Sequence, residues 1–540
     1  MFGGNHVSLN VWLKYYRTCP TDPTDLRIKF IHYLQDSNST SLGAITPSKN
    51  VCRSLRYKHL NCRGRDVSFH TLGGDQKILL FEFEKVSKNS INILLALLSS
   101  CRRSGIFNSP QSIMKKTKTI DFENSRRRFL KKSVVAIGAF AIVPRHVLGG
   151  KGFLAPSDTL TKGIIGVGGM GRGHIGYEGT KVLAMCDVDQ RHLKDAIAMA
   201  GGNIRGYSDF RELLAQPDID IVHIATPPHW HGIMSVMAAQ AGKDVWCEKP
   251  MTRTIGEGKR VVEAMTQYNR MFRLNTWFRF KDNFYGMATT VKPLKKAVDS
   301  GMLGWPLKVT ISGVTGFNWK FYWVGKTNLE PTPVPQELDY DMWLGPAQYK
   351  PYHPHRVHST FRGYWDYDGG GLGDMGQHYI DPVQYFLGKD DTSPVRVDVD
   401  CPQQHDDAVG TWRRIEFTYA DGCKIVLDGE NKDRTVPYIE GPKGKIYRGF
   451  KSDIPDILKV IDTFPDPEPQ ISVFSESVVT RKKFGLNEVN GHRSSTIVNM
   501  GKIALQLGRS LEFDPLKQEF ISDEAANRLI HQPMRGPWKI

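Results

Sequence analysis

The sequence is poor in cysteine and in long hydrophobic runs. Eight cysteines are spread over 540 residues, and those in residues 1–113 lack the short paired spacing of a zinc site, so we expect no metal centre. The four beyond residue 150 fit folding in a reducing compartment, and we expect no disulfides. The apolar run "INILLALL" at 91–98 is too short to cross a bilayer, so no stable membrane span is predicted.

Most of the chain also lacks an excess of charge. The formal net charge is +16, yet residues 1–113 carry 15 lysines and arginines against 7 aspartates and glutamates, and residues 114–150 carry 9 against 2. Residues 151–540 therefore have a balance of only +1. A nucleic-acid-binding domain concentrates basic residues on its folded surface, so we expect no nucleic-acid partner. The 40% of hydrophobic residues are sufficient to form real cores.

A segment typical of an export signal lies well inside the chain. Met114 opens the charged stretch "MKKTKTIDFENSRRRFLKKS", and the apolar run "VVAIGAFAIVP" follows it. The arginines at 126–128 precede a Phe-Leu pair, as in twin-arginine signals. The alternative is a basic helix start with a buried helix behind it. The order of the parts favours a signal over 114–150 that directs the protein to the periplasm through the twin-arginine export machinery. No small-residue cleavage site follows, which leaves cleavage open.

Residues 1–113 show no sustained helical or strand periodicity. We therefore expect translation to start at Met114, and residues 1–113 to be a spurious or unstructured extension. The predicted folded part consists of a domain at 160–285 and a second domain at 286–540.

The domain at 160–285 alternates short apolar runs with helical segments. "KGIIGVGGMG", "KVLAMCDVD", "IDIVHIATPP" and "DVWCEKP" read as strands or strand ends, separated by segments such as "HGIMSVMAAQAGK" and "TIGEGKRVVEAMTQYN". Strands separated by helices of this length favour a parallel sheet covered on both faces. The sequence therefore predicts an α/β fold with a doubly wound Rossmann sheet, which binds ligands beyond the carboxyl ends of its strands.

A glycine motif follows the first of these strands. Gly166, Gly168 and Gly171 form G-x-G-x-x-G, which permits a tight turn, an approach to a pyrophosphate and close helix packing. The next strand ends at Asp187, sixteen residues after Gly171. A carboxylate there accepts both ribose hydroxyls and repels a 2′-phosphate. NAD is therefore favoured over NADP as the cofactor.

The domain at 286–540 has more strands and fewer alternating units, which favours a mainly antiparallel open sheet with helices on one side. A loop rich in Trp, Tyr and Pro (317–368) leads to a glycine run and then to Asp374 and His378, four residues apart on one helix face. A histidine beside a carboxylate can take a proton from an alcohol near neutral pH. An ordinary structural hydrogen bond is the alternative. The glycine run and the upstream cofactor domain favour catalysis.

The motifs "GVGGMG", "CDVD", "TPPHWH", "CEKP" and "GGGLGDMGQHYID", in this order, resemble the Gfo/Idh/MocA family over roughly residues 160–540. That family includes glucose–fructose oxidoreductase and inositol dehydrogenase. The resemblance implies a C-terminal α/β domain whose open sheet carries the substrate site and often the oligomer contact, so we expect a homo-oligomer. It also implies that His378 is the general base, that Asp374 orients it or binds a hydroxyl, and that Lys249 orients substrate and cofactor. The active-site motif of the family's NAD-using glycosidase branch is not evident.

The candidate site residues lie in the glycine turn, at strand ends and on the later helix. The candidate catalytic residues are Lys249, Asp374 and His378. The candidate cofactor-binding residues are Gly166, Gly168, Gly169, Met170, Gly171, Asp187, Thr226, Pro227, His231, Glu248 and Lys249.

The leading hypothesis is oxidation of a secondary alcohol of a sugar, glycoside or polyol by hydride transfer to a tightly held NAD. Export favours a retained cofactor, because no pool of free nicotinamide nucleotide is maintained outside the cytoplasm. One alternative is a redox-neutral enzyme that uses transient oxidation to break a glycosidic bond by elimination. Another is a non-catalytic sugar-binding protein. Aromatic residues of the Trp-rich loop either stack on a pyranose ring or pack in the core: Trp319, Tyr322, Trp323, Trp365 and Tyr367.

Overall fold

The computed structural model describes residues 8–17, 26–35, 56–61, 66–71, 78–83, 159–280, 289–315, 317, 319–433 and 435–540. The chain divides into two compact units, Met1–Ala139 and Phe140–Ile540. The predicted signal at 114–150 lies outside the described residues.

The described residues of the first unit form an antiparallel sheet in the order β1-β2-β5-β4-β3. Its strands are β1 (Ser8–Arg17), β2 (Leu26–Gln35), β3 (Arg56–Asn61), β4 (Asp66–Thr71) and β5 (Ile78–Phe83). The sequence predicts no element in this region. The interpretation of residues 1–113 as a spurious extension stays a prediction.

A six-stranded parallel sheet begins the second unit. Its order is β11-β10-β9-β6-β7-β8, and every neighbouring pair is parallel. The strands are β6 (Thr161–Ile165), β7 (Lys181–Cys186), β8 (Arg205–Tyr207), β9 (Ile221–Ile224), β10 (Asp244–Glu248) and β11 (Phe272–Asn275). β9 and β10 are buried along their whole length, as expected of strands covered on both faces. This is the doubly wound order with its switch point between β6 and β9, and it confirms the predicted Rossmann fold.

Helices connect these strands. They are α4 (Gly169–Gly173), α5 (Gln190–Ala200), α6 (Phe210–Leu214), α7 (His231–Gln240) and α8 (Ile255–Gln267), with the 3₁₀ segments η3 (Tyr177–Gly179) and η4 (Pro228–Trp230). The Asp209 carboxylate caps α6 by accepting the Arg211 N–H at 2.9 Å. Gly242, with φ of 77°, lies just past the end of α7. These local signals explain why the helices begin and end where they do.

The second domain has a nine-stranded sheet in the order β18-β17-β16-β12-β15-β14-β13-β19-β20. Only β12 and β15 pair in parallel among its described strands, which confirms a mainly antiparallel sheet. The strands are β12 (Lys308–Ser312), β13 (Arg396–Asp400), β14 (Arg414–Thr418), β15 (Lys424–Asp428), β16 (Ile439–Gly441), β17 (Gly444–Tyr447), β18 (Lys451–Ser452), β19 (Leu511–Asp514) and β20 (Glu519–Phe520).

The helices of this domain include two long ones, α11 (Gly370–Phe386) and α14 (Glu488–Leu507). The others are α9 (Val291–Asp299), α10 (Tyr340–Leu344), α12 (Ile457–Asp462), α13 (Phe474–Thr480) and α15 (Glu524–Arg528), with the 3₁₀ segments η5 (Pro354–Arg356), η6 (His358–Gly363) and η7 (Arg448–Phe450). Among the described residues, no helix has the length and apolar character that crossing a bilayer requires.

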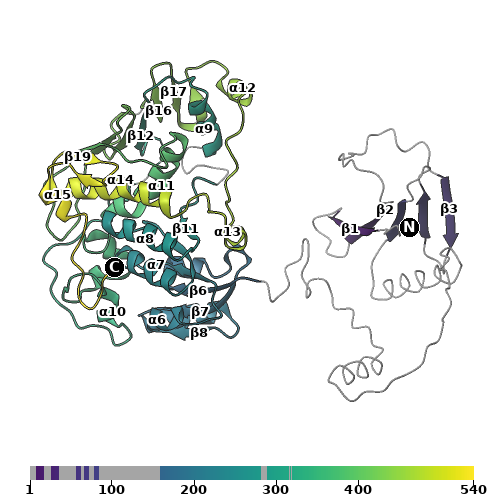
Figure 1. Ribbon diagram of the computed structural model, residues 1–540, viewed down its shortest axis with the longest axis horizontal. Coiled ribbons are helices and arrows are strands. Elements are labelled where there is room, and N and C mark those ends of the chain that lie inside the picture. The colour runs from purple at the N-terminus through teal and green to yellow at the C-terminus, as the bar shows by residue number, and fades with distance from the viewer. Residues whose placement is uncertain are drawn as a thin grey trace, which may run out of the picture. The chain divides into compact units, whose positions relative to one another are not determined.

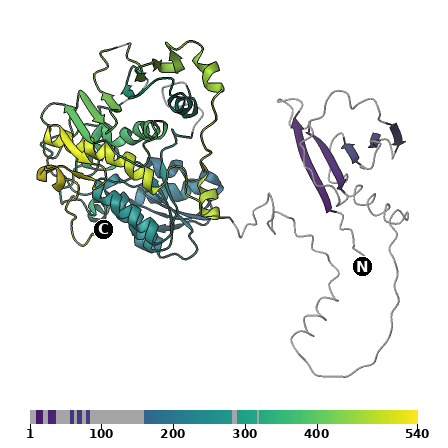
Figure 2. The ribbon, with the colours of Figure 1, turned by 45° about the horizontal axis from the view of Figure 1, so that its top comes forward.

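The second unit is layered. Figure 1 shows α7 and α8 over one face of the parallel sheet, α11 and α14 next to them, and the nine-stranded sheet beyond. α11 and α14 lie side by side in Figure 2 as well, and α8 packs against α14. The two domains therefore meet through helices, and α11 brings its residues toward the carboxyl ends of the Rossmann strands.

Residues from the end of the chain complete the core of the Rossmann domain. Phe474, on α13, is fully buried there, and the Trp538 ring lies edge-on to Trp230 at 4.7 Å between centroids. The Leu274 N–H donates to the Leu486 carbonyl at 3.1 Å. Residues of the C-terminal domain thus also form part of the core of the Rossmann domain.

Candidate active site

The glycine turn after β6 has the geometry that a dinucleotide requires. Gly166 has φ of +83°, and a Cβ there would lie 2.8 Å from the Ala225 carbonyl oxygen. A Cβ on Gly171 would collide with the Gly166 carbonyl, so α4 packs directly on the turn. A Cβ on Gly169 would meet nothing within 4 Å. Gly166 and Gly171 therefore pack closely against neighbouring backbone, whereas the turn is open at Gly169, on the side where a pyrophosphate binds.

Asp187 lies immediately after β7, where a ribose is expected. Its Oδ2 accepts the Val167 N–H at 2.8 Å, and its Oδ1 accepts the Asp189 N–H at 2.9 Å. Burial raises the pKa of this carboxyl group. The two backbone bonds fix its orientation, and a carboxylate has further lone pairs for hydroxyl donors. The group therefore fits the ribose hydroxyls of NAD.

A cavity of about 460 Å³ lies at the switch point of the parallel sheet. Among the candidate residues, those lining it are Gly166, Gly168, Gly169, Met170, Asp187, Thr226, Pro227, Glu248, Lys249 and Asp374. The Rossmann domain (160–285) contributes the glycine turn and the ends of β9 and β10. The C-terminal domain (286–540) contributes residues of η6 and α11. The structure therefore brings most of the predicted site together in one space.

Three candidate residues are not among those that line this cavity. Gly171 is the packing position already described. His231 begins α7, where its Nδ1 lies 2.7 Å from the Pro250 carbonyl and its Nε2 lies 2.8 Å from the Thr226 carbonyl. It therefore links the loops that follow β9 and β10. His378 is the third.

Asp374, on α11, is surrounded by positive charge. Its Oδ1 lies 3.0 Å from Lys249 Nζ and 2.8 Å from Arg362 Nε, and its Oδ2 lies 2.7 Å from Lys320 Nζ. Lys249 Nζ also donates to the Asp374 carbonyl at 2.6 Å. Burial favours protonation, but the three cations outweigh it and hold the pKa of Asp374 well below its usual range.

His378 is held by Thr276, which no pattern in the sequence singles out. Its Nδ1 lies 2.7 Å from the hydroxyl of Thr276, the first residue after β11, and its ring stacks on Phe278 at 4.7 Å. Burial, and then the nearby Lys249 ammonium, lower the pKa of His378 to about 3. No hydrogen bond joins His378 to Asp374 within the described part of the chain. Of the two roles expected of Asp374, the contacts do not include one that orients His378, because cations engage the carboxylate and Thr276 fixes the ring; binding of a hydroxyl stays a prediction.

Asp368 is a further acidic residue of the cavity and is not among the predicted site residues. Its side chain is almost fully buried, and its Oδ1 has no hydrogen-bond partner among the described residues. Burial raises the pKa of this group to about 7. Its position in "WDYDGGG", just before the glycine run, is the one signal in the sequence that points to it.

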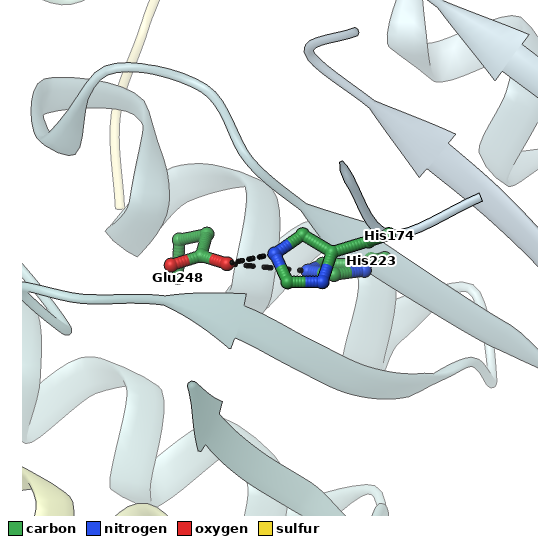
Figure 3. A group of neighbouring side chains, drawn as sticks. All are labelled: His174, His223 and Glu248. Carbon is green, nitrogen blue, oxygen red and sulfur yellow. Dashed lines mark ion pairs between the residues drawn. The ribbon is translucent and has the colours of Figure 1, made fainter. Parts of the chain in front are cut away.

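Glu248, the last residue of β10, points at two buried histidines (Figure 3). Its Oε1 lies 2.8 Å from His174 Nε2 and 3.7 Å from His223 Nε2, and it accepts from Asn275 Nδ2 at 2.5 Å. Burial lowers the pKa of His223 to about 3. The donor atoms could hold a divalent metal, but the buried Lys162 ammonium adds positive charge beside them. We interpret the group as a hydrogen-bonded anchor for the end of β10.

The aromatic residues considered for sugar stacking do not line the cavity. Trp319, Trp365 and Tyr367 are buried in hydrophobic clusters, and the Tyr322 side chain is exposed. The core-packing alternative is therefore the correct one for the first three. Trp230, Trp343 and Phe361 line the cavity instead.

Two protein-family models match the second unit. Residues 160–276 match the oxidoreductase family, NAD-binding Rossmann fold, and residues 287–540 match the oxidoreductase family, C-terminal alpha/beta domain. Inositol 2-dehydrogenase 1 of Saccharopolyspora erythraea is 30% identical over 157 residues, which cover 28% of this chain and 44% of the relative. A glycosyl hydrolase family 109 protein of Shewanella pealeana is 29% identical over 266 residues, 40% of this chain and 55% of the relative.

The chain spans about half the length of the curated relatives it matches. Among solved structures, it is similar to the WlbA dehydrogenase from Chromobactrium violaceum in complex with NADH and UDP-GlcNAcA. That similarity has 19% identity and a TM-score of 0.47, and it covers 66% of this chain and 96% of the other.

Proposed function

The chain belongs to the Gfo/Idh/MocA family of NAD-binding oxidoreductases, and we propose that it oxidises a secondary alcohol of a sugar, glycoside or polyol. The observation that carries this proposal is the meeting of Lys249, Asp374 and the glycine turn in one cavity, with His378 one turn along α11 from Asp374. NAD, when bound, supplies the acceptor for the hydride that leaves the alcohol carbon.

The chain's own residues supply binding and proton transfer. When Nδ1 of His378 donates to the Thr276 hydroxyl, Nε2 carries the lone pair that accepts the alcohol proton. A low pKa keeps this imidazole neutral at physiological pH, which is the form a base requires. Lys249 stabilises developing negative charge on the alcohol oxygen, while Asp374 holds its ammonium in place.

Conservative substitutions test these roles. We expect Lys249→Met and His378→Asn each to lower kcat by about 10²- to 10⁴-fold, because each removes a proton-transfer or charge-stabilising group. NAD should stay bound, as measured by absorbance and mass after denaturation of the purified protein. The exposed Lys181→Met serves as a control with full activity. Full activity of both site variants would contradict the proposal.

A second candidate function is redox-neutral cleavage of a glycosidic bond. The similarity to the glycosyl hydrolase family 109 protein over 266 residues favours it. Here oxidation at one carbon acidifies the neighbouring C–H, the glycosidic bond breaks by elimination, water adds to the resulting double bond, and the hydride returns at the end. Cleaved carbohydrate without net NADH would identify this reaction, whereas a ketone product with one NADH per turnover would identify a dehydrogenase.

We also propose that the enzyme acts in the periplasm after twin-arginine export. The support is the order of charged head, arginines and apolar run in 114–150, and the near-neutral charge of everything that follows. Changing Arg126, Arg127 and Arg128 to lysine should leave a folded, NAD-containing protein in the cytoplasm, measured by cell fractionation and immunoblotting. The same change at Arg413 and Arg414, an exposed pair in the folded part of the chain, is the matched control and should not alter localisation. Unchanged localisation of the first variant, or a native N-terminus at Met1, would contradict the proposal.

A further inference from the structure

The Trp-rich loop of the C-terminal domain, which contains α10 and η6, is attached to the Rossmann domain immediately beside Asp187. The Gln190 N–H donates to the Glu337 carbonyl, and the Asp339 N–H donates to the Val188 carbonyl, each at 3.0 Å. These two bonds flank an antiparallel bridge between the two segments. The backbone that follows the expected ribose-binding residue is therefore hydrogen-bonded to the other domain.

A second contact between the domains lies at η6. His358 Nε2 is 3.4 Å from Asp189 Oδ2, and the centroids of the His358 and His192 rings are 4.7 Å apart. His192 is in turn close to the ribose-binding position, with 3.8 Å between its Nδ1 and Asp187 Oδ2. His358, His192 and Asp187 all line the cavity. The ribose end of the cavity therefore has walls from both domains.

α10 forms a further part of the wall at the same end of the cavity. Phe210, which follows β8, lines the cavity, and its ring centroid lies 5.4 Å from that of Trp230. The Trp230 Nε1–H donates to the carbonyl of Trp343, on α10, at 3.1 Å. Met342 and Trp343 line the cavity as well. Because β7 and β8 lie on the ribose side of the switch point, the adenosine half of NAD is expected at this end.

We propose that His358 and α10 of the C-terminal domain complete the binding site for the adenosine half of NAD, and that they retain the cofactor in the protein. A cofactor held by a Rossmann domain alone leaves by moving away from the strand ends. Here release also requires the Trp-rich loop to separate from 188–190 and from η4, with loss of the hydrogen bonds described above. Contacts that break before release lower the dissociation rate. The inference goes beyond the proposed reaction, because it concerns cofactor retention and not the alcohol.

The backbone conformation at His358 determines which substitution tests this role. Its φ is +52°, which glycine adopts without strain, whereas alanine does not. His358→Gly therefore removes the ring without forcing the loop to change its course. Met342→Ala shortens a second cavity-lining side chain, on α10. His353→Gly is the matched control, because His353 belongs to the same loop but is not among the residues that line the cavity.

Exchange of bound NAD measures retention without any turnover. The purified NAD-containing protein is incubated with an excess of isotopically labelled NAD, and samples are desalted and denatured at intervals. Mass spectrometry of the released nucleotide then gives the labelled fraction. We expect His358→Gly and Met342→Ala each to exchange NAD about tenfold faster than the wild-type protein or more, and His353→Gly to exchange it at the wild-type rate. Circular dichroism verifies that each variant is folded.

An unchanged exchange rate in His358→Gly would overturn the inference, as would a purified protein that contains no nucleotide. If His358→Gly does not fold, the rate in Met342→Ala decides in the same way. Equal acceleration by His353→Gly would also overturn the inference, because general loosening of the loop would then control release. Retained NAD with His358-dependent exchange, but without oxidation of any alcohol, would support the inference and contradict the proposed reaction. Alcohol oxidation with freely exchanging NAD would do the reverse.

Discussion

Two arginines of the second domain occupy opposite environments. Arg279 is completely buried, where its guanidinium pairs with Asp381 at 2.7 Å and with Asp390 at 2.6 Å. Arg396 lies on the outer face of the sheet, 43% exposed, paired with Asp398 at 2.6 Å and with Glu512. Loss of the arginine should therefore lower the free energy of unfolding more at the buried pair than at the exposed pair, because water screens only the exposed charges.

We expect Arg279→Met to lower the free energy of unfolding by about 3–5 kcal/mol, because it leaves the buried Asp381 without its partner. Burial already raises the pKa of Asp381 to about 6. Arg396→Met should cost less than about 1 kcal/mol, as exposed pairs do. Urea unfolding monitored by circular dichroism measures both. Equal losses of unfolding free energy in the two variants would contradict the expected difference between the buried and the exposed ion pair.

Elements with strong local signals are predictable from this sequence. The strands at "KGIIG", "VLAMC" and "IVHIA" are short apolar runs bounded by glycine, acid or proline, and each forms a strand of the parallel sheet. The position of Asp187 after β7 and the position of His231 at the start of α7 follow from the same signals. The positions of these two residues at the ends of strands could therefore be predicted from the sequence alone.

Elements whose pattern depends on distant partners are not predictable in this way. α14 is buried on nearly all sides between α8, α11 and β13, so it shows no clear apolar face for a periodicity argument to find. The parallel pair β12–β15 joins strands more than a hundred residues apart. Asp374 meets Lys320 and Arg362 only through loops that precede its helix. The spacing that suggested a pair with His378 carried no information about these cations.

The molecule as a whole keeps several histidines neutral in its interior. Burial lowers the pKa of His223, His229 and His378 to about 3 and that of His492 to about 4. An unfolded chain protonates histidine near pH 6.5. Between these values the unfolded state binds more protons than the folded state. Stability from this source is therefore complete above about pH 6.5 and is lost as the pH falls toward 3.

We expect the free energy of unfolding to decrease from pH 7 to pH 4.5, measured by urea unfolding across that range. Buried carboxyl groups of raised pKa act in the opposite direction and reduce the slope, among them Asp187, Glu257, Asp368 and Asp381. His229→Gln keeps a donor for the Trp343 carbonyl and should lower the slope by about 1.4 kcal/mol per pH unit. An unchanged slope in this variant would show that His229 takes up no proton on unfolding, and so that it is already protonated in the folded state.

The packing of Trp538 and Phe474 into the Rossmann core has a consequence for protein synthesis. A ribosome that has completed the six parallel strands has not yet made the side chains that close their hydrophobic core. The cofactor domain, although first in the sequence of the second unit, therefore becomes complete only when the final segment has emerged. Nascent chains of intermediate length expose the Phe210 and Trp230 surface that Trp538 later covers. Such surfaces are what chaperones bind, so the order of translation and the order of folding differ in this protein.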